Sequence, residues 1–383
     1  MREKKRVVTY LMQRQAEVLF GDPTERAAFL EALTEGRSRE KSIIVLQDRP
    51  EIRTFPRLGA TAWQPDWVVR LGDGFRPAQH PLYERGAYYS LDFSSVFAAS
   101  AMLAIPDAPR RVLDLCASPG GKAIFAWRAF RPELLYCNET IRKRSRTLIE
   151  NLARCGAEAG RVWSADPSVY ARRFSAGFDL VIVDAPCSGQ SLLAKGDVAP
   201  GAFDPPMVDM NHSRQRRITG NAVHCLAPGG YLLYMTCTFS RKENERIVQW
   251  LLEEHSELEA VEVPHLAAHR SPYADVPCYR LFPHSGLGAG AFTALLRRKG
   301  DRAELPEFDE MPTIWSYGQP IPFASREDEA GDAAPAETES KPKSESKPRR
   351  AYGKPAPKVA RRPGYGRRES GGRSNRPGRR GKR

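Results

Sequence analysis

Short apolar runs that each end in a glycine turn or an acidic residue constrain the fold of this chain most. The first run, 111–115, leads through a Pro-Gly-Gly turn into a helix-like segment at 123–130. Three later runs, 134–137, 161–164 and 178–183, lead to Glu139, Asp166 and Asp184. Parallel sheets build ligand sites where their strands end. The pattern predicts a doubly wound α/β fold with a mostly parallel sheet and one site at its edge.

Two cysteines follow apolar runs directly. Cys187 lies in Asp-Ala-Pro-Cys-Ser-Gly after the run at 178–183, and Cys237 lies in Thr-Cys-Thr after the run at 231–235. Both positions are turn-like strand ends, so we expect two thiols to face one crevice. Most lone cysteines simply pack in the interior, and that is the expectation for the following four: Cys137, Cys155, Cys225 and Cys278.

The cysteine pattern also bears on metals, disulfides and compartment. No two of the seven cysteines have the short spacing of a structural zinc site, so no metal is expected. An odd cysteine count without a secretory signal argues against disulfides. There is no apolar run of membrane-spanning length. We therefore expect a reduced cytoplasmic protein in which a thiolate can act as a nucleophile.

The loop after the first run has the features of a nucleoside site. It is not a P-loop and not G-x-G-x-x-G, but its two glycines are expected to let the backbone approach a ligand. The acids that end the later runs fit S-adenosyl-L-methionine better than NAD or ATP. Glu139 and Asp166 could instead cap turns or helices, and Lys122 could be a solvated lysine. The predicted cofactor contacts are Cys116, Ala117, Ser118, Pro119, Gly120, Gly121, Lys122, Glu139, Asp166 and Asp184.

Three motifs in this order resemble one enzyme family. The chain is similar to the Sun/Nop-type, RsmB/RsmF-like RNA (cytosine-5) methyltransferases in Asp114–Lys122, Asp184–Gly189 and Thr236–Thr238. Weaker similarities are the segment 280–292 and the helix-like segment 214–218. The resemblance covers about residues 80–298. One departure is Leu91, near which the family usually has a glutamine.

The resemblance implies a reaction and roles for four residues. In the family a cysteine thiolate adds to carbon 6 of cytosine so that carbon 5 can accept a methyl group. The matching positions make Cys237 the nucleophile and Cys187 the cysteine that assists release. Asp184 would hold the base near N3 and face the amino group of the cofactor, and Lys122 would supply positive charge beside it. The implied fold is a Rossmann-like class I methyltransferase with a seven-stranded sheet.

The chain divides into four expected parts. We expect a small N-terminal α/β domain at 1–78 that positions RNA, a methyltransferase domain at 79–300, an extension at 301–326 and a disordered tail at 327–383. In the first part, a helix is predicted from Asp22 to Gly36 and a strand at 41–47. Trp63 and Trp67 are expected in the core rather than on a recognition surface.

Charge is concentrated at the C-terminal end. Residues 341–383 hold 17 basic and 2 acidic residues, which leaves 42 basic and 44 acidic residues in the rest of the chain. Few large apolar residues occur there, so the segment is expected to be disordered and to bind RNA phosphates. A solubilising tail is the alternative. An acidic stretch at 327–339 precedes it.

The expected substrate is a cytosine in structured RNA, with ribosomal RNA preferred and transfer RNA as the alternative. A DNA cytosine methylase is disfavoured, because those enzymes resemble a pattern with the nucleophile in the Pro-Cys segment. A ribosome-assembly factor with a vestigial site would show erosion at Asp184, Cys237 or Gly120, and all three are intact. We expect a monomer that uses S-adenosyl-L-methionine, binds RNA and does not bind membranes.

Overall fold

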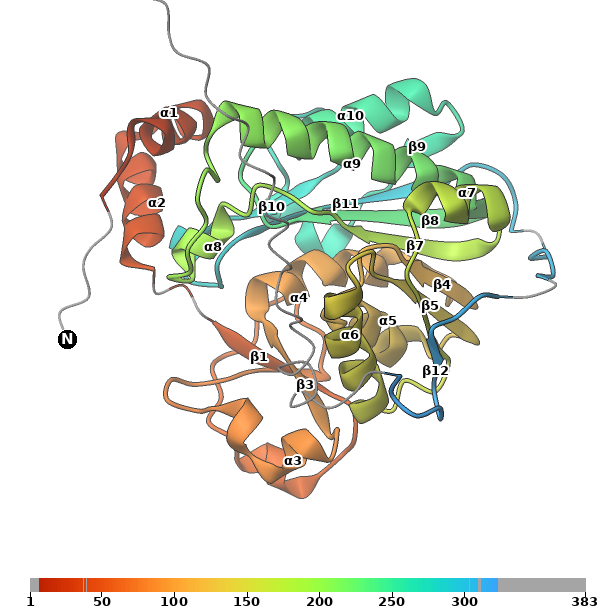
Figure 1. Ribbon diagram of the computed structural model, residues 1–383. Coiled ribbons are helices and arrows are strands. Elements are labelled where there is room, and N and C mark those ends of the chain that lie inside the picture. Colours follow the sequence, from red (N-terminus) through yellow and green to blue (C-terminus); the bar gives the residue numbers. More distant parts are fainter. Residues whose placement is uncertain (1–6, 37, 39, 303, 309–310, 323–383) are drawn as a thin grey trace, which may run out of the picture. The chain divides into compact units, whose positions relative to one another are not determined.

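A nine-stranded sheet forms the centre of this computed structural model, which describes residues 7–36, 38, 40–302, 304–308 and 311–322 (Figure 1). The predicted tail at 327–383 lies outside the described residues. The sheet order is β10-β11-β8-β7-β4-β5-β6-β12, and β9 pairs with β11. Its strands are β4 (Arg111–Asp114), β5 (Leu134–Asn138), β6 (Gly160–Trp163), β7 (Phe178–Asp184), β8 (Leu226–Thr236), β9 (Leu258–Ala260), β10 (Tyr279–Leu281), β11 (Ala291–Arg298) and β12 (Trp315–Ser316).

The five strands from β6 to β8 are parallel, and the four outer strands are antiparallel to their neighbours. This arrangement confirms the predicted α/β class and the mostly parallel sheet. The predicted count of seven strands is too low, because β9 and β12 also join the sheet. They have three and two residues, so pairing defines them rather than any hydrophobic pattern.

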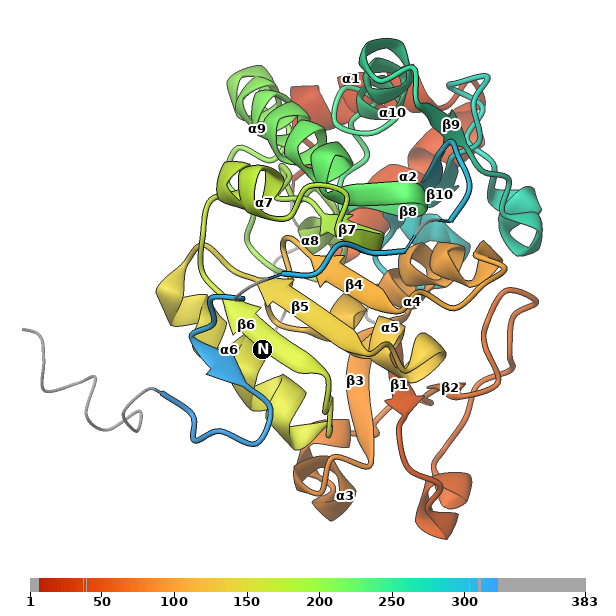
Figure 2. The same cartoon turned by 90° about the vertical axis from the view of Figure 1, so that its right-hand side faces the viewer.

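Helices cover both faces of the sheet, which explains why β7 is buried along almost its whole length (Figure 2). One face carries α7 (Pro167–Arg173), α9 (Pro205–Cys225) and α10 (Glu245–Glu254), and the other carries α4 (Phe93–Ser100), α5 (Gly121–Phe130) and α6 (Arg142–Arg154). The helices predicted at 123–130 and around 214–218 are confirmed as α5 and α9. Shorter helices are α8 (Ser191–Ala194), η3 (Ala101–Ala104), η4 (Pro264–His269) and η5 (Pro283–Ser285).

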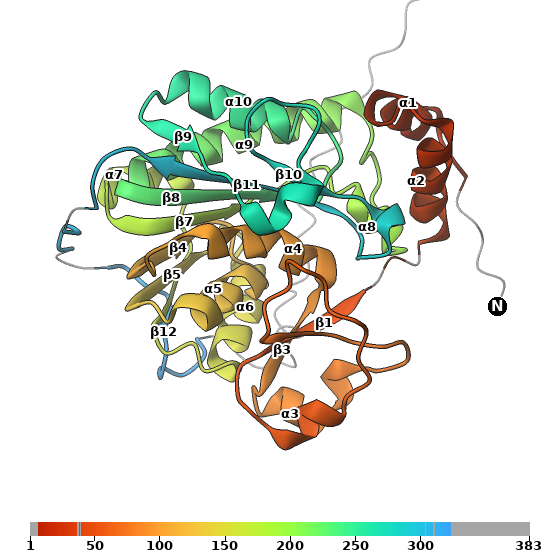
Figure 3. The same ribbon diagram turned by 180° about the vertical axis from the view of Figure 1, so that it is seen from behind.

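The N-terminal part contains three α-helices, two short 3-10 helices and a three-stranded antiparallel sheet of order β2-β1-β3 (Figure 3). The Asp22 side chain accepts a hydrogen bond from the Thr24 N–H at 2.8 Å, and Gly36 ends the same helix at a φ of 64°, as predicted. Because β3 pairs with β1, the small sheet contains strands from both sides of the predicted domain boundary at residue 78. The boundary itself stays a prediction. The elements are α1 (Tyr10–Leu19), α2 (Pro23–Glu35), β1 (Lys41–Val45), η1 (Pro50–Thr54), β2 (Val68–Arg70), η2 (Pro77–Gln79), α3 (Pro81–Glu84) and β3 (Tyr88–Asp92).

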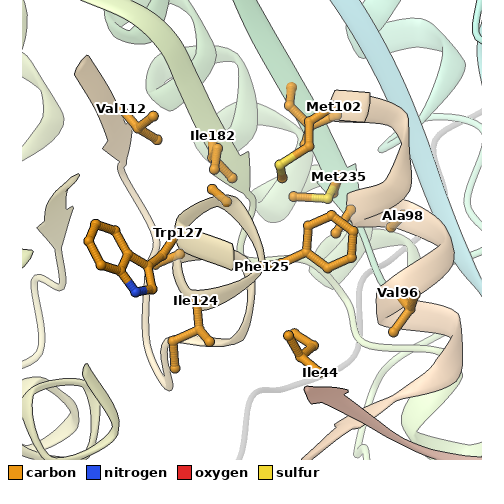
Figure 4. Close-up of a cluster of buried hydrophobic side chains, with 14 of the residues drawn as sticks. Ile44, Val96, Ala98, Met102, Val112, Ile124, Phe125, Trp127, Ile182 and Met235 are labelled. Atoms are coloured by element: carbon orange, nitrogen blue, oxygen red, sulfur yellow. The ribbon is translucent and has the colours of Figure 1, made fainter. Parts of the chain in front are cut away.

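One hydrophobic core joins the small sheet to the large one. Figure 4 shows Ile44 of β1 near Phe125 of α5 and Val96 of α4, with Met235 of β8 behind them. Burial of such side chains stabilises by about 1.5–3 kcal/mol each, so the two sheets support each other. Within the described residues, no helix is both long and apolar enough to cross a membrane.

Candidate functional site

A cavity of about 580 Å³ opens at the carboxyl ends of the parallel strands. Its walls come from the loops after β4, β5, β6, β7 and β8, where parallel sheets build ligand sites. Four predicted residues, Ala117, Pro119, Gly120 and Gly121, belong to the first loop but not to the lining, and Lys122 contacts the lining residue Asp184. The predicted residues that line the cavity are Cys116, Ser118, Glu139, Asp166, Asp184, Cys187 and Cys237.

Gly120 and Gly121 allow their loop to pack closely against protein side chains. Gly120 has a φ of 112°, a backbone conformation that residues other than glycine rarely adopt. A Cβ at this position would lie 3.3 Å from the Leu148 side chain. A Cβ at Gly121 would lie 2.7 Å from the Leu91 side chain. A Cβ at either position would therefore crowd protein side chains, and the expectation that these glycines let the backbone approach a ligand stays a prediction.

The thiols of Cys187 and Cys237 face each other at the cavity, with 3.3 Å between their Sγ atoms. The hydrogen bond from Cys187 is the main cause of the lowered pKa of Cys237, and the positive charges of Lys195 and Lys122 lower it further. Burial and the negative charge of Asp184 act in the opposite direction but do not outweigh these contacts. The same hydrogen bond, together with burial, raises the pKa of Cys187 well above its usual value. The pair therefore favours a thiolate at Cys237 and a protonated thiol at Cys187.

Lys122 and Asp184 form an ion pair with 2.6 Å between Nζ and Oδ2. The lysine side chain is only 15% exposed, which rules out the alternative of a solvated lysine. Burial opposes its charge, but the contact with Asp184 outweighs burial and raises the pKa of Lys122. A charged pair therefore lies beside the Cys237 thiol, in the wall of a small adjoining cavity.

Lys195 is a second cation near Cys237 that was not predicted from the sequence. It directly follows α8, and its Nζ lies 3.4 Å from Oδ2 of Asp92. The backbone N–H of Ser191, at the start of α8, donates to the carbonyl of Cys237 at 3.1 Å. Lys195 lines the small adjoining cavity together with Cys237. Its only sequence signal was its place shortly after the Cys187 segment.

Glu139 and Asp166 both line the cavity and both make local contacts. Glu139 is 4% exposed, accepts from the Ile141 N–H at 2.8 Å and pairs with Arg144 at 3.1 Å. Asp166 caps α7 through the Ser168 N–H. It also forms an ion pair of 2.7 Å with Arg217. The capping alternative is therefore present in the structure, alongside the position of both carboxylates at the cavity.

Glu243 ties the two cysteine segments together and was also missed. It is fully buried, and its carboxylate accepts from the backbone N–H of Ser188 at 2.9 Å and from the Ser188 hydroxyl at 2.6 Å. Gln215 of α9 and Thr238 also donate to it. Burial raises the pKa of Glu243, although these hydrogen bonds oppose that effect. The signal in the sequence was an acid–amide–acid run, 243–245, placed close after Cys237.

Asp114, at the end of β4, is a buried carboxyl below the first loop. Its Oδ1 accepts from the Cys116 N–H at 3.2 Å, while its Oδ2 is buried without a hydrogen-bond partner. Burial and the nearby Asp184 raise the pKa of Asp114 to about 7. Among the described residues, no cluster of His, Cys, Asp or Glu is arranged to hold a metal ion.

Solved structures show the same fold. A methyltransferase homolog protein from Pyrococcus horikoshii matches with a TM-score of 0.57 and 21% identity, covering 76% of this chain and 100% of that chain. The structure of NSun6 from Pyrococcus horikoshii with SFG matches with a TM-score of 0.62 and 18% identity, covering 76% of this chain and 99% of the other.

Curated relatives are similar over the same region. The ribosomal RNA small subunit methyltransferase F of Klebsiella pneumoniae is 32% identical over 249 residues, covering 63% of this chain and 51% of the relative. That of Cronobacter sakazakii is 31% identical over 291 residues, covering 73% and 58%. The chain thus spans about half the length of these relatives. The model of the family described as 16S rRNA methyltransferase RsmB/F matches residues 101–297, just over half of the 383 residues. The chain belongs to the 16S rRNA methyltransferase RsmB/F family.

Proposed function

We propose that this protein transfers a methyl group from S-adenosyl-L-methionine to carbon 5 of a cytosine in ribosomal RNA of the small subunit. The observation that carries the proposal is the pair of thiols, 3.3 Å apart, at the edge of a cavity lined by Asp184 and Glu139. Family membership supports methyl transfer, and the names of the relatives support small-subunit ribosomal RNA. The protein would act in the cytoplasm, as a monomer, with its basic tail on RNA phosphates.

The cavity has the chemistry that an adenosyl group requires. Apolar residues such as Ile141 and Pro167 can contact an adenine ring, and the carboxylates of Glu139 and Asp166 can accept hydrogen bonds from ribose and amino groups. An ionised carboxylate has about four acceptor positions, so the contacts of Glu139 with protein groups leave room for a ligand. When bound, S-adenosyl-L-methionine supplies an electrophilic methyl group. We expect Glu139→Ala to weaken its binding by about 1.5–3 kcal/mol in calorimetric titration.

Cys237 is the proposed nucleophile. Its lowered pKa favours the thiolate, which forms a bond to carbon 6 of the base as the carbon 5–carbon 6 electron pair moves to carbon 5. Carbon 5 is then electron-rich enough to accept the methyl group. The attack comes from above the ring plane, so the cytosine must be unpaired or flipped out of its stack.

Cys187 is proposed to assist the release of the product. After methylation, solvent water in the open cavity takes the carbon 5 proton. The electron pair of that C–H bond re-forms the carbon 5–carbon 6 double bond, and the bond between carbon 6 and sulfur breaks to release Cys237 as a thiolate. Because the pKa of Cys187 is raised, its thiol stays protonated and can donate a hydrogen bond to the departing sulfur. The hydrogen bond from Cys187 that favours the Cys237 thiolate before attack would therefore also stabilise that thiolate as the leaving group.

Asp184 and Lys122 are proposed to orient the base. Lys122 forms an ion pair of 2.6 Å with one oxygen of Asp184, which fixes the direction of the carboxylate. The remaining acceptor positions can receive the amino group of cytosine and the amino group of the cofactor. Glu243 would act indirectly: its hydrogen bonds with Ser188 and Thr238 would hold the Cys187 and Cys237 segments in fixed positions relative to each other.

The proposal is tested by incubating the full-length protein with small-subunit ribosomal RNA and the cofactor, followed by nuclease digestion and mass spectrometry. The expected product is 5-methylcytidine, which bisulfite sequencing of RNA from cells with and without the gene would map. Product on transfer RNA alone would select the alternative substrate. RNA binding without product on either RNA would select an assembly factor with a vestigial site.

A further inference from the structure

The two tryptophans of the N-terminal part have different environments. Trp63 is 5% exposed and stacks on Phe93, with ring centroids 4.6 Å apart, so it belongs to the core as predicted. Trp67 is only partly buried and lines a second cavity of about 370 Å³. The prediction that both tryptophans serve the core is therefore incomplete for Trp67.

This second cavity, the Trp67 pocket, lies between the ends of β1 and α5 and the segments around η1 and β2. Besides the indole, it is lined by four arginines: Arg49, Arg53, Arg57 and Arg128. They face two carboxylates, Asp48 and Asp66, so the pocket carries an excess of positive charge. Its residues are separate from those of the cavity that holds the thiols.

Neutral acceptors hold three of the four guanidinium groups. Arg49, Arg57 and Arg128 donate hydrogen bonds of 2.8 Å or slightly longer to oxygens that carry no charge. These are the side-chain oxygen of Gln47 and the main-chain oxygens of Ile52 and Val45. Such contacts fix the direction of a guanidinium group without neutralising it, and a bound anion would complete them.

The fourth arginine differs from these three, because it already has a carboxylate partner. Arg53 forms an ion pair of 3.1 Å with Asp48, and both side chains are largely exposed. Burial, and then the charge of Arg131, lower the pKa of Arg128. Positive charge at Arg128 is therefore held at a cost that a nearby anion would offset.

The indole adds a surface for a base. The guanidinium carbon of Arg128 lies 5.2 Å from the centroid of the Trp67 ring. The Phe125 ring packs against the same indole, with 4.7 Å between the ring centroids. An aromatic ring beside arginines is the combination with which proteins hold single-stranded nucleic acid, through stacking and phosphate contacts. An acidic peptide would use the arginines but would have no base to stack on the ring.

Helix α5 connects this pocket to the thiol-bearing edge. It begins at Gly121, beside Lys122, and Arg128 lies seven residues further on, which corresponds to about 10 Å along the axis. Lys122 and Arg128 therefore lie near opposite ends of the same helix. We propose that the Trp67 pocket binds a nucleotide of single-stranded RNA near the target cytosine, with its phosphate on Arg49 and Arg57 and its base on Trp67. This inference rests on the proposed function for the identity of the partner.

The first test compares two double variants of the full-length protein that remove the same charge. Arg49→Gln with Arg57→Gln alters the pocket, while Arg76→Gln with Arg85→Gln removes two exposed arginines from the same part of the chain outside it. Affinity for a labelled single-stranded oligouridylate is measured by fluorescence anisotropy over a salt series. Loss of two phosphate contacts should lower the slope of log affinity against log salt by about 1.4 and weaken binding about 25-fold near 0.1 M salt.

Equal losses in the two double variants would overturn the proposal, because charge alone would then explain binding. Inorganic phosphate is added as a competitor, and displacement at equal concentrations of phosphate and oligonucleotide would identify a simple anion site instead. Binding of an acidic peptide with the same loss in the pocket variant would also refute an RNA site. These measurements need no methyl transfer, so they are independent of whether the proposed reaction is correct.

The indole is tested separately. Trp67→Leu should weaken binding of the oligonucleotide at least about fivefold, whereas Trp67→Phe, which keeps an aromatic face, should retain most of the affinity. Thermal unfolding of both variants checks that the core around Phe125 is intact. If Trp67→Phe is folded and binds as poorly as Trp67→Leu, stacking on the ring is not the reason for binding.

Discussion

Cys225 and Cys237 are both cysteines close to the ends of regular elements, but their surroundings give them opposite properties. Cys225, at the end of α9, is fully buried among apolar side chains, and burial raises its pKa to about 12. Cys237 is only partly buried at the edge of the cavity, and the hydrogen bond from Cys187 and two lysines lower its pKa. Burial without such partners makes a thiol inert.

Two further cysteines extend the contrast. Burial raises the pKa of Cys155 to about 11 and that of Cys278 to about 12. Both side chains pack in the hydrophobic core, as predicted. The difference from Cys237 teaches that the pKa of a thiol in this chain follows from its hydrogen-bond and charged partners as well as from its exposure.

The largest expected effect is that of Cys237→Ala. Methyl transfer should fall at least about 10⁴-fold, because the variant lacks the proposed nucleophile for carbon 6. Binding of S-adenosyl-L-methionine should be unchanged, since the thiol takes part in the chemical step. Single-turnover assays and calorimetric titration measure the two quantities. Substantial activity in this variant would show that the two thiols do not differ in the proposed way.

Cys187→Ala should instead trap the reaction after attack. Without the donor to the leaving sulfur, a covalent adduct between the protein and RNA should accumulate in the presence of the cofactor. It would appear as a slow band on a denaturing gel. An adduct with Cys237→Ala but none with Cys187→Ala would reverse the assigned roles.

Lys195→Met should change the pH dependence of thiol reactivity. Because Lys195 helps to lower the pKa of Cys237, its removal should raise that pKa. In the variant, the thiolate should therefore become protonated at a higher pH than in the unaltered protein. Alkylation of Cys237 by iodoacetamide, followed by peptide mass spectrometry, should need a higher pH. A pKa higher by about 1 would slow alkylation about tenfold near neutrality. Lys299→Met, an exposed lysine elsewhere, is the control, and identical pH profiles would remove Lys195 from the site.

The smallest effect is expected for Cys225→Ala. Removing a buried sulfur should lower the free energy of unfolding by about 1 kcal/mol, through lost packing, and leave methyl transfer unchanged. Urea denaturation and a standard activity assay measure both. A loss of activity comparable with that of the Cys187 variant would contradict the division between packed and reactive cysteines.

The local elements were largely predictable. The apolar run 178–183 and the segment 123–130 form β7 and α5, because continuous burial and helical spacing leave a pattern in neighbouring residues. The edge strands β9 and β12 left no such pattern, since a strand of two or three residues exists only through its partner. The pairing of β3 with β1 was missed because the two strands are far apart in the chain and pairing between distant segments leaves no local pattern.

Most of the lining of the site was also predictable, but its support was not. Strand ends and motifs indicated Asp184, Cys187 and Cys237, because parallel strands bring their carboxyl ends to one edge. Glu243 and Lys195 act through contacts with residues distant in the chain, such as Ser188 and Asp92. No periodic pattern marks such contacts, and the same holds for Trp67, whose pocket collects arginines from the segments around β1, η1 and α5.

The sequence by itself determined that two cysteines end neighbouring parallel strands beside an acidic and glycine-containing edge. Only the tertiary structure decided which of them has the lowered pKa. A pKa depends on hydrogen bonds and charges within a few ångströms, and here these come from α5, the end of α8 and the partner thiol. Those distances are set by packing between elements that are far apart in the chain.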